Sequence, residues 1–419
     1  MNISLLIPSF NSESFISANL SSIVESNSYL SSGSLSVYLF DSCSTDGTLT
    51  TSLNRVTSPI QFKGYSVKDS GPADALNAGL KIALANPSLD IIGWLNSDDM
   101  YALGAIDRAI SAFKKNPKLK IVYGLGRHID AAGKDLGAYP TLPPTASIKS
   151  FSAGSFICQP TVFFRKEVFA EVGLLDESLK TAFDLDLWLR IFKRYHKNQI
   201  GFINKVQAYS RLHDQCITKR LRQTVALESM QVIARHLGSA PGHWILTYFD
   251  EMYERYPFVD EKESLVEIIK GVLAKAKPFM KAAEFKTLVQ TLQADARLRL
   301  SSSNTFVSVQ TDGWVSKRVI VKLRYKKGGK RTLRLICKGG WPKDANLNLT
   351  IRSMAGEVEQ VKLGAQDEFV LTLEAPETPT EAFAAWVIET RQSFVPSLHN
   401  KRSKDHRKLS FLVQGLELV

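Results

Sequence analysis

The stretch that decides the fold is Asp90-Ile91-Ile92-Gly93-Trp94-Leu95-Asn96-Ser97-Asp98-Asp99, an apolar run followed directly by two adjacent carboxylates. The run predicts a buried strand over 90–95, and the carboxyl end of such a strand is where an open α/β sheet binds its ligands. Oxygen ligands on a rigid strand end suit Mg²⁺ or Mn²⁺ bridged to a diphosphate. Alternatively, the Asp pair caps a helix that starts near Leu103, since Asp is a preferred N-cap residue.

Two further buried strands are predicted upstream, and each ends in a small polar turn. Residues 3–7 run into Pro8-Ser9-Phe10-Asn11, and residues 35–40 run into Asp41-Ser42-Cys43-Ser44-Thr45-Asp46-Gly47-Thr48. Strand-like and helix-like patterns then alternate to about residue 125, which is typical of βαβ units. The remaining elements expected in this part are helices at 12–26, 72–85 and 103–115 and strands near 59–65 and 119–124.

Five ordered motifs over residues 1 to about 215 carry a family resemblance. The three above are joined by Asp69-Ser70-Gly71-Pro72-Ala73-Asp74-Ala75-Leu76-Asn77-Ala78-Gly79-Leu80 and Phe183-Asp184-Leu185-Asp186-Leu187-Trp188-Leu189-Arg190. Together they resemble a family 2 glycosyltransferase of the α/β GT-A fold, with a Rossmann-like sheet, of the bacterial polysaccharide type. The resemblance implies an inverting, hexosyl-type transfer from a nucleotide diphosphate sugar, with a UDP-sugar favoured, to a glycan or lipid-linked glycan. It also implies a divalent metal, Mn²⁺ or Mg²⁺, and an Asp general base.

The resemblance assigns the donor side of the site to the first turns. It places Pro8, Asn11 and Asp41 in the nucleobase pocket, where a carboxylate can accept the imide proton of uracil. A buried acceptor left unpaired costs about 1–3 kcal/mol, so that contact would be selective. The alternative for Asp41 is a plain Asx-turn. Asp69 is expected beside the donor ribose and diphosphate, ahead of a helix whose positive amino end favours anions.

The metal motif departs from the pattern of the resembling family, which is Asp-x-Asp. Asn96 stands where the first Asp usually is, so Asp98 is the best metal ligand and Asn96 is expected to contact ribose or a metal-bound water. The loss of one negative charge should weaken metal binding. His213 resembles the late His that completes the metal site in some relatives. The alternative is an ordinary surface histidine or one with satisfied hydrogen bonds.

Asp184 matches the position of the family's catalytic base. A base must lie within hydrogen-bond reach of the acceptor hydroxyl, on the sugar face opposite the diphosphate. The alternative is that Asp184 or Asp186 caps the helix that carries Trp188. Their i,i+2 spacing sends the two side chains to different faces of a helix, so only one can be the base. Asp186 and Gln159 are assigned to the acceptor side of the site.

Length and pattern predict three parts in this chain of 419 residues, which exceeds the usual size of a single core. Residues 1–220 form the GT-A domain, 221–300 carry only helical patterns, and 301–419 form an all-β, sandwich-like accessory domain. In the last part the apolar period switches to two from about Asn304. Segments 393–397 and 407–411 resemble β-rich tails attached to some bacterial polysaccharide glycosyltransferases.

The cysteines and the amino terminus predict a reduced cytoplasmic protein. Cys43, Cys158, Cys216 and Cys337 show no CxxC pairing, and the chain opens directly into a strand with no secretion signal. No apolar run approaches the roughly 18 residues that a spanning helix needs. Any membrane contact is therefore expected to be peripheral, at the inner face of the membrane.

The formal charge of +12 is concentrated in one segment of the carboxyl-terminal part. Ten basic residues and no acid lie between Lys317 and Lys338, around a Gly328-Gly329 turn. The pattern predicts one hairpin with an apolar inner face and an outer face that carries Lys322, Arg324 and Arg334. That face is either simply solvated or docks on anionic lipid headgroups or phosphate-rich glycans. Nucleic acid is not expected as a partner, because no nucleic-acid motif accompanies the charge.

Two other function classes remain as alternatives. A sugar nucleotidyltransferase would need a glycine-rich, basic loop after the first strand, and Pro8-Ser9-Phe10-Asn11 has none. A non-catalytic glycan-binding or scaffold protein with a decayed site is conceivable because Asn96 and Phe183 replace family acids. The presence of Asp41, Asp98 and Asp184 together argues against decay.

Overall fold

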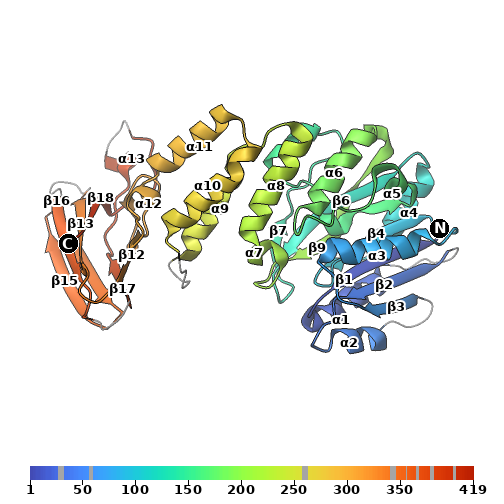
Figure 1. The fold of residues 1–419 in the computed structure, drawn as a ribbon, viewed down its shortest axis with the longest axis horizontal. Coiled ribbons are helices and arrows are strands. Elements are labelled where there is room, and N and C mark those ends of the chain that lie inside the picture. Colours follow the sequence, from blue (N-terminus) through green and yellow to red (C-terminus); the bar gives the residue numbers. More distant parts are fainter. Residues whose placement is uncertain are drawn as a thin grey trace. The chain divides into compact units, whose positions relative to one another are not determined.

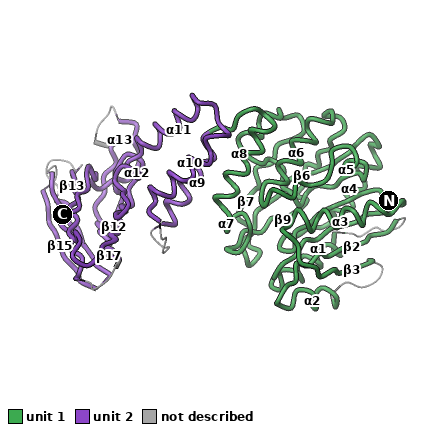
Figure 2. The backbone as a smooth tube through the Cα atoms, viewed as in Figure 1, with its two compact units in different colours: residues 1–241 green, residues 242–419 purple. Residues whose placement is uncertain are grey.

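The chain divides into two compact units, Met1–Pro241 and Gly242–Val419 (Figure 2). The structure is a computed structural model that describes residues 1–26, 33–55, 60–256, 263–339, 346–354, 356–364, 368–377, 382–399 and 403–419. The predicted division into 1–220, 221–300 and 301–419 stays a prediction.

A nine-stranded sheet forms the centre of the first unit (Figure 1). Its order is β3-β2-β1-β4-β8-β6-β9-β5, and β7 pairs with β6 outside this path. The strands are β1 (Ile3–Ser9), β2 (Leu35–Asp41), β3 (Gln61–Ser66), β4 (Ile91–Trp94), β5 (Met100–Tyr101), β6 (Ile121–Ile129), β7 (Asp135–Ala138), β8 (Phe163–Arg165) and β9 (Ile200–Arg211).

The first four strands of this sheet are parallel. β1 pairs in parallel with β2 and with β4, and β2 pairs in parallel with β3. Every residue of β1 and β2 is buried, as expected for strands covered on both faces, which read as continuous apolar runs. The chain then departs from a purely parallel sheet, because β8 inserts antiparallel between β4 and β6. The turns after β1, β2 and β4 consequently meet at one edge.

Helices cover the sheet where the apolar periodicity predicts them. α3 (Pro72–Leu84) packs on β1 and β2, and α4 (Ala105–Lys115) packs on β6 and β9. The contact of α3 with β2 needs a glycine, because a Cβ on Gly79 would come within 2.6 Å of the Phe40 ring. The other helices of this unit are α1 (Glu13–Glu25), α2 (Thr48–Arg55), α5 (Glu167–Val172), α6 (Phe183–Arg194), α7 (Ile217–Arg220) and α8 (Arg222–Leu237).

The second unit begins with helices and continues as antiparallel strands. The helices are α9 (His243–Arg255), α10 (Leu265–Ala276), α11 (Ala282–Ala294), α12 (Ala296–Arg299) and, later in the chain, α13 (Pro396–His399). The strands are β10 (Thr305–Val307), β11 (Trp314–Val315), β12 (Arg318–Tyr325), β13 (Thr332–Gly339), β14 (Leu347–Ser353), β15 (Val358–Leu363), β16 (Glu368–Glu374), β17 (Ala382–Glu389) and β18 (Phe411–Leu418). One sheet has the order β10-β12-β17-β14-β15 and the other has the order β11-β18-β13-β16.

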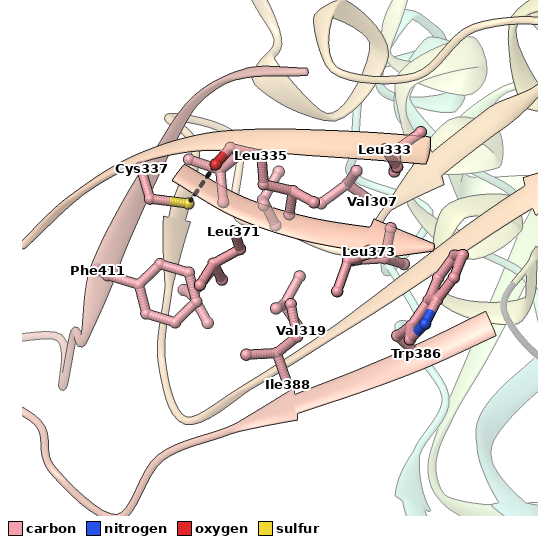
Figure 3. Close-up of a cluster of buried hydrophobic side chains, with 14 of the residues drawn as sticks. Val307, Val319, Leu333, Leu335, Cys337, Leu371, Leu373, Trp386, Ile388 and Phe411 are labelled. Carbon is pink, nitrogen blue, oxygen red and sulfur yellow. Dashed lines mark hydrogen bonds between the residues drawn. The ribbon is translucent and has the colours of Figure 1, made fainter. Parts of the chain in front are cut away.

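The two sheets of the second unit share one apolar core. Figure 3 shows Val319 and Ile388 of the five-stranded sheet with Leu335 and Leu371 of the four-stranded sheet in the same buried cluster. Alternate residues of β12 and β13 are buried, which is the period-two pattern of a strand with one face in a core. The expected all-β, sandwich-like part is therefore confirmed.

The prediction of a single basic hairpin is wrong. β12 pairs with β10 and β17 in one sheet, whereas β13 pairs with β16 and β18 in the other. Their inner faces meet across the core, so their outer faces point away from each other. Lys322 and Arg324 consequently lie on one side of the sandwich and Arg334 on the opposite side. The alternation predicts which residues face the core, but two facing sheets satisfy it as well as one hairpin does.

None of the helices within the described ranges combines the length and the apolar character that crossing a bilayer requires.

Candidate functional site

The turns after β1 and β2 are tied together by reciprocal hydrogen bonds. The Asn11 N–H donates to Ser44 Oγ (2.8 Å), and the Thr45 N–H donates to Asn11 Oδ1 (2.9 Å). Asn11 and Cys43 both adopt positive φ angles, 48° and 56°, which non-glycine residues adopt rarely. Such backbone outliers gather at functional sites. The two turns therefore form a preorganised polar edge of the sheet.

Asp41 is buried at this edge and its carboxylate has three donors. It accepts hydrogen bonds from the Ser44 N–H (2.9 Å), from Ser66 Oγ (3.0 Å) and from the Ser44 hydroxyl. Asp41 lies opposite Ser9 in the parallel register, one residue beyond Pro8, which is also buried. The structure thus brings Pro8, Asn11 and Asp41 to one place. Their contact with a nucleobase stays a prediction.

Asp69 lies beside the second turn, as a donor-site residue should. Its own N–H faces Ser42 Oγ at 3.4 Å, and its Oδ1 accepts from the Gly71 N–H (3.0 Å). Burial, with the charges of Asp74 and Asp41, raises the pKa of Asp69 despite these hydrogen bonds. The carboxylates of Asp69, Asp74 and Asp41 therefore lie close together at this edge, where they would attract a cationic or hydrogen-bond-donating ligand.

Only one of the two adjacent carboxylates after β4 is available to a ligand. Asp99 is 3% exposed, and its side chain accepts from the Arg211 N–H (2.9 Å) and from Asn96 Nδ2 (3.1 Å). Burial, and next the charge of Asp98, raises the pKa of Asp99 well above its usual value. Asn96 also accepts from the Trp94 indole (3.2 Å), so it is partly occupied within its own turn. Asp99 is an anchor of the loop, whereas the Asp98 carboxylate is more exposed than that of Asp99.

The structure places His213 next to Asp98, although 115 residues separate them. His213 Nε2 lies 3.0 Å from Asp98 Oδ2, and the imidazole packs at 4.6 Å on the ring of Phe15. Two ligand atoms at right angles on an octahedral ion with bonds of 2.0–2.1 Å are about 3.0 Å apart. The separation is that of a hydrogen bond in the structure, and the same separation is compatible with two neighbouring positions on Mg²⁺ or Mn²⁺.

The remaining coordination positions would be open to a ligand. No cluster of three or more His, Cys, Asp or Glu side chains that could hold a metal occurs among the residues described. Mg²⁺ in proteins is usually bound by one or two carboxylates plus substrate phosphates and water. Binding of a metal at Asp98 and His213 therefore stays a prediction.

Arg211 holds the segment 96–99, which carries Asp98, a role that the sequence did not reveal. Its Nε donates to the Asp98 carbonyl (2.8 Å), its N–H donates to Asp99 Oδ1 (2.9 Å), and its Nη1 donates to the Asp130 carbonyl (2.9 Å). The guanidinium also lies 5.1 Å from the centre of the Phe15 ring, the ring on which His213 packs. Arg211 therefore positions both candidate metal ligands.

Asn19 of α1 supports the same loop from the other side. It is fully buried, and its Nδ2 donates to the carbonyls of Asn96 (2.8 Å) and Asp99 (2.9 Å). The one sequence signal is a polar residue on the buried apolar stripe formed by Ile16, Leu20 and Ile23. Buried amides are usually hydrogen-bonded, and here the Nδ2 group bonds the loop while Oδ1 has no hydrogen-bond partner among the described residues.

Asp184 lies in the first turn of α6, near the end of β4. Its Oδ1 accepts from the Leu185 N–H (2.7 Å), and burial raises its pKa to about 6. The neighbouring Phe183 stacks on Trp94 with ring centres 5.8 Å apart, which brings the start of α6 beside β4. The charges of Asp99 and Asp184 both add to the burial that raises the pKa of the Cys158 thiol. The segment 96–99 and Asp184 therefore both lie near Cys158.

Asp186 has the opposite environment two residues later. It is 3% exposed and accepts from Arg190 Nε (2.8 Å), while His236 Nε2 of α8 lies 2.8 Å from its other oxygen. These partners outweigh the effect of burial and lower the pKa of Asp186. Carboxylates whose surroundings push their pKa values apart generally have different roles. The predicted contact of Asp186 with an acceptor stays a prediction, and its visible role is to join α6 to α8.

Gln159 lies against the same end of β4. Its Nε2 donates to the Trp94 carbonyl (2.8 Å), and its Oε1 is buried with no hydrogen-bond partner among the described residues. A buried oxygen without a donor is uncommon and favours a ligand or a water as its partner. The assignment of Gln159 to the acceptor side stays a prediction.

Known proteins match the amino-terminal part of the chain. Residues 4–173 match the family model described as Glycosyl transferase family 2. An uncharacterized glycosyltransferase of Rickettsia typhi is 29% identical over 185 residues, which are 40% of this chain and 52% of that protein. An uncharacterized glycosyltransferase of Rickettsia prowazekii is 31% identical over 163 residues, 36% of this chain and 47% of that protein.

Among solved structures, S. aureus TarS 1–349 in complex with UDP-GlcNAc aligns with a TM-score of 0.46 and 16% identity, covering 70% of this chain and 85% of that chain. The chain spans about half the length of the two Rickettsia relatives, 52% and 47%. The family match lies on the sheet whose strand ends carry the candidate residues. Residues 4–173 are therefore similar to glycosyl transferase family 2.

Proposed function

We propose that the first compact unit is a metal-dependent, inverting glycosyltransferase that uses a nucleotide diphosphate sugar, with a UDP-hexose favoured. The acceptor is a glycan or a lipid-linked glycan. The observation that carries this proposal is the pair formed by Asp98, after β4, and His213, after β9, whose side-chain atoms are 3.0 Å apart. The family of the domain supports glycosyl transfer as the reaction class.

Asp98 and His213 would hold the ion, and Arg211 and Asn19 would keep their loop in place. A bound divalent ion supplies positive charge that stabilises the departing diphosphate. Pro8, Asn11 and Asp41 would receive the base, while Asp69 and Asn96 would lie beside the ribose. Pro8 and Asp41 lie at the carboxyl ends of β1 and β2, and the other donor-side residues lie on the turns that follow β1, β3 and β4 or on the segment that follows β9.

Asp184 would take the proton from the acceptor hydroxyl. The hydroxyl oxygen then bonds to the anomeric carbon while the bond from that carbon to the diphosphate oxygen breaks, and the diphosphate leaves on the opposite side. This in-line displacement inverts the anomeric centre. Burial suits Asp184 to the task, because a base works best when its pKa lies near the operating pH.

The pH dependence of the transfer rate should follow the ionisation of the Asp184 carboxyl group. Its pKa is raised to about 6, and only the ionised form accepts a proton. The rate should therefore fall about ten-fold per pH unit below pH 6 and level off above it. Initial rates at saturating donor, acceptor and metal between pH 5 and pH 8 would show this. A profile that stays flat down to pH 5 would contradict the assignment.

The proposal as a whole is tested by screening the full chain against UDP-, GDP- and dTDP-sugars with Mn²⁺, with Mg²⁺ and with a chelator. We expect slow release of nucleoside diphosphate from one UDP-sugar, with water as acceptor, only when metal is present. Formation of a nucleotide sugar from UTP and a hexose 1-phosphate, with release of pyrophosphate, would instead favour the nucleotidyltransferase. Glycan binding without any turnover or nucleotide binding would favour the scaffold protein.

We also propose that the reaction belongs to polysaccharide biosynthesis in the cytoplasm. All four cysteines are free, and Cys43 is exposed. A free exposed thiol is normal in a reducing compartment, where disulfides are rare. Growing cells can be separated into cytoplasmic and membrane fractions, and immunodetection in each fraction would show where the protein is located.

A further inference from the structure

One outer face of the second unit is strongly basic. We call the outward side chains of β12, β17, β14 and β15 the basic face. The strand register defines it, because residues paired across antiparallel strands point to the same side. Arg318 pairs with Glu389, Ile320 with Val387 and Arg324 with Phe383, whereas the residues between them are buried in the core.

The basic face carries five basic residues and one acid among its described outward positions. The basic residues are Arg318, Lys322, Arg324, Arg352 and Lys362, and the acid is Glu389. Glu389 lies between Arg318 (3.6 Å) and Arg352 (3.8 Å), whose side chains are 55% and 56% exposed. Such exposed pairs neutralise little. Lys322 Nζ lies 3.5 Å from the Tyr256 carbonyl, and the charge of Arg324 adds to the Ser264 hydrogen bonds that lower the pKa of Glu267 in α10. The face therefore keeps a net positive charge, with one acid of α10 near Arg324.

Large apolar side chains stand on the same face. Phe383 is 53% exposed under the Arg324 guanidinium, and Val358, opposite Arg352, is 54% exposed. Met354, whose N–H donates to the Ala385 carbonyl (3.0 Å), is 79% exposed. At the β10 end the situation differs, since Phe306 is 2% exposed against Tyr253 and Tyr256 of the helical part. The uncovered part of the face thus combines cations with protruding apolar groups.

The outer face of the four-stranded sheet has no such character. Arg334 lies opposite Glu417 and Thr372, and Lys338 lies opposite Glu368 with 3.9 Å between the charged atoms. Each cation there has an acid on a neighbouring strand, as on an ordinary solvated sheet. The two outer faces therefore offer a test surface and a matched control within one domain.

We propose that the basic face docks on the surface of an anionic lipid bilayer. Basic residues near such a surface are attracted electrostatically, and apolar side chains between them enter the boundary of headgroups and acyl chains. The register places these groups on one face of the sheet, so a single surface can contact several of them together. This inference is independent of the proposed glycosyl transfer, because it concerns residues outside the family 2 domain.

The experiment uses the full chain and vesicles of phosphatidylcholine with and without phosphatidylglycerol. The wild type should bind the anionic vesicles at low salt and dissociate from them as the salt concentration rises. It should not bind the neutral vesicles. The double variant R324E/R352E should lose at least about 25-fold in affinity, since each basic residue near the surface accounts for about five-fold. F383S should weaken binding without changing its salt dependence. The control R334E/K338E alters net charge equally and should bind like the wild type.

Three results would overturn the proposal. Equal losses in R324E/R352E and in the control would mean that net charge alone attracts the chain. Unchanged binding in R324E/R352E would place the contact elsewhere. Binding of soluble polyphosphate that is lost in R324E/R352E, with no vesicle binding, would assign the face to a polyanionic glycan. Thermal melting of each variant shows that the domain is folded, and UDP binding reports separately on the first unit.

Discussion

Asp184→Asn is expected to lower the transfer rate by about 10²–10⁴-fold while the affinity for the donor stays nearly intact. The substitution keeps the shape of the side chain and removes the proton acceptor. Donor affinity should survive because the candidate donor residues lie on other turns. Steady-state kinetics with the acceptor varied, together with calorimetric titration of the nucleoside diphosphate, would separate the two effects.

Stability provides a second readout for the same variant. Burial raises the pKa of Asp184 to about 6, so its ionisation is disfavoured in the folded state relative to the unfolded chain. A raised pKa contributes stability that is present at low pH and is lost as the pH rises through the folded value, near 6. At pH 7 the neutral Asn removes this penalty. Asp184→Asn should therefore melt no lower than the wild type at pH 7, although it is inactive.

Asp186→Asn is the matched control. Asp184→Asn should lower the transfer rate, whereas Asp186→Asn should lower the stability. Asp186 is buried between Arg190 and His236, and removing one partner of a buried ion pair typically costs about 3–5 kcal/mol. We expect a lower melting temperature with much of the activity kept at temperatures where the variant is folded. If Asp186→Asn lost transfer without losing stability and Asp184→Asn stayed active, the two roles would be reversed.

Asp98→Ala is expected to abolish the effect of Mn²⁺ or Mg²⁺ on binding of a nucleoside diphosphate and, with it, transfer. Asp98 contacts His213 and supplies the carboxylate of the proposed ligand pair. His213→Ala should weaken metal dependence less, because it removes a neutral ligand. Stability should change by roughly 1 kcal/mol or less for Asp98→Ala, as for other partly exposed sites.

The control for this prediction is Asp214→Asn, which removes a carboxylate next to His213 in the chain. The Asp214 side chain is 96% exposed and lies 3.5 Å from Lys219, outside the proposed ligand pair. Calorimetric titration of UDP with and without metal should give wild-type behaviour for Asp214→Asn. Metal enhancement that persists in Asp98→Ala, or that is missing in the wild type, would rule out the assignment of Asp98.

Strand and helix positions in the first unit could be predicted because they follow from local pattern. Continuous apolar runs such as 35–40 mark strands buried on both faces, and Pro72 marks the first turn of a helix. The pairing of β12 and β13 could not be predicted in this way. A glycine turn between two alternating segments favours a hairpin, yet these strands join different sheets. The alternation of apolar and polar residues predicts which side of a strand is buried. It does not predict which strand pairs with it.

The candidate site was found in part from the sequence. Motif order located Asp98, His213 and Asp184, and the structure shows the first two in contact. Arg211 and Asn19 were missed, because a polar residue within a strand or helix looks the same in sequence whether it faces solvent or a loop. Their role depends on where the segment 96–99 folds against them, which no local pattern records.

The sequence by itself predicted the fold class, the family resemblance and the polar residues at the strand ends. Only the tertiary structure decided which member of each acidic pair is available. Asp99 is anchored by Arg211 and Asn96 while Asp98 faces His213, and Asp186 is held by His236 of α8. Adjacent carboxylates have the same intrinsic chemistry, and their protonation and reach depend on burial and on partners contributed by distant segments. Those partners exist only once the chain has folded.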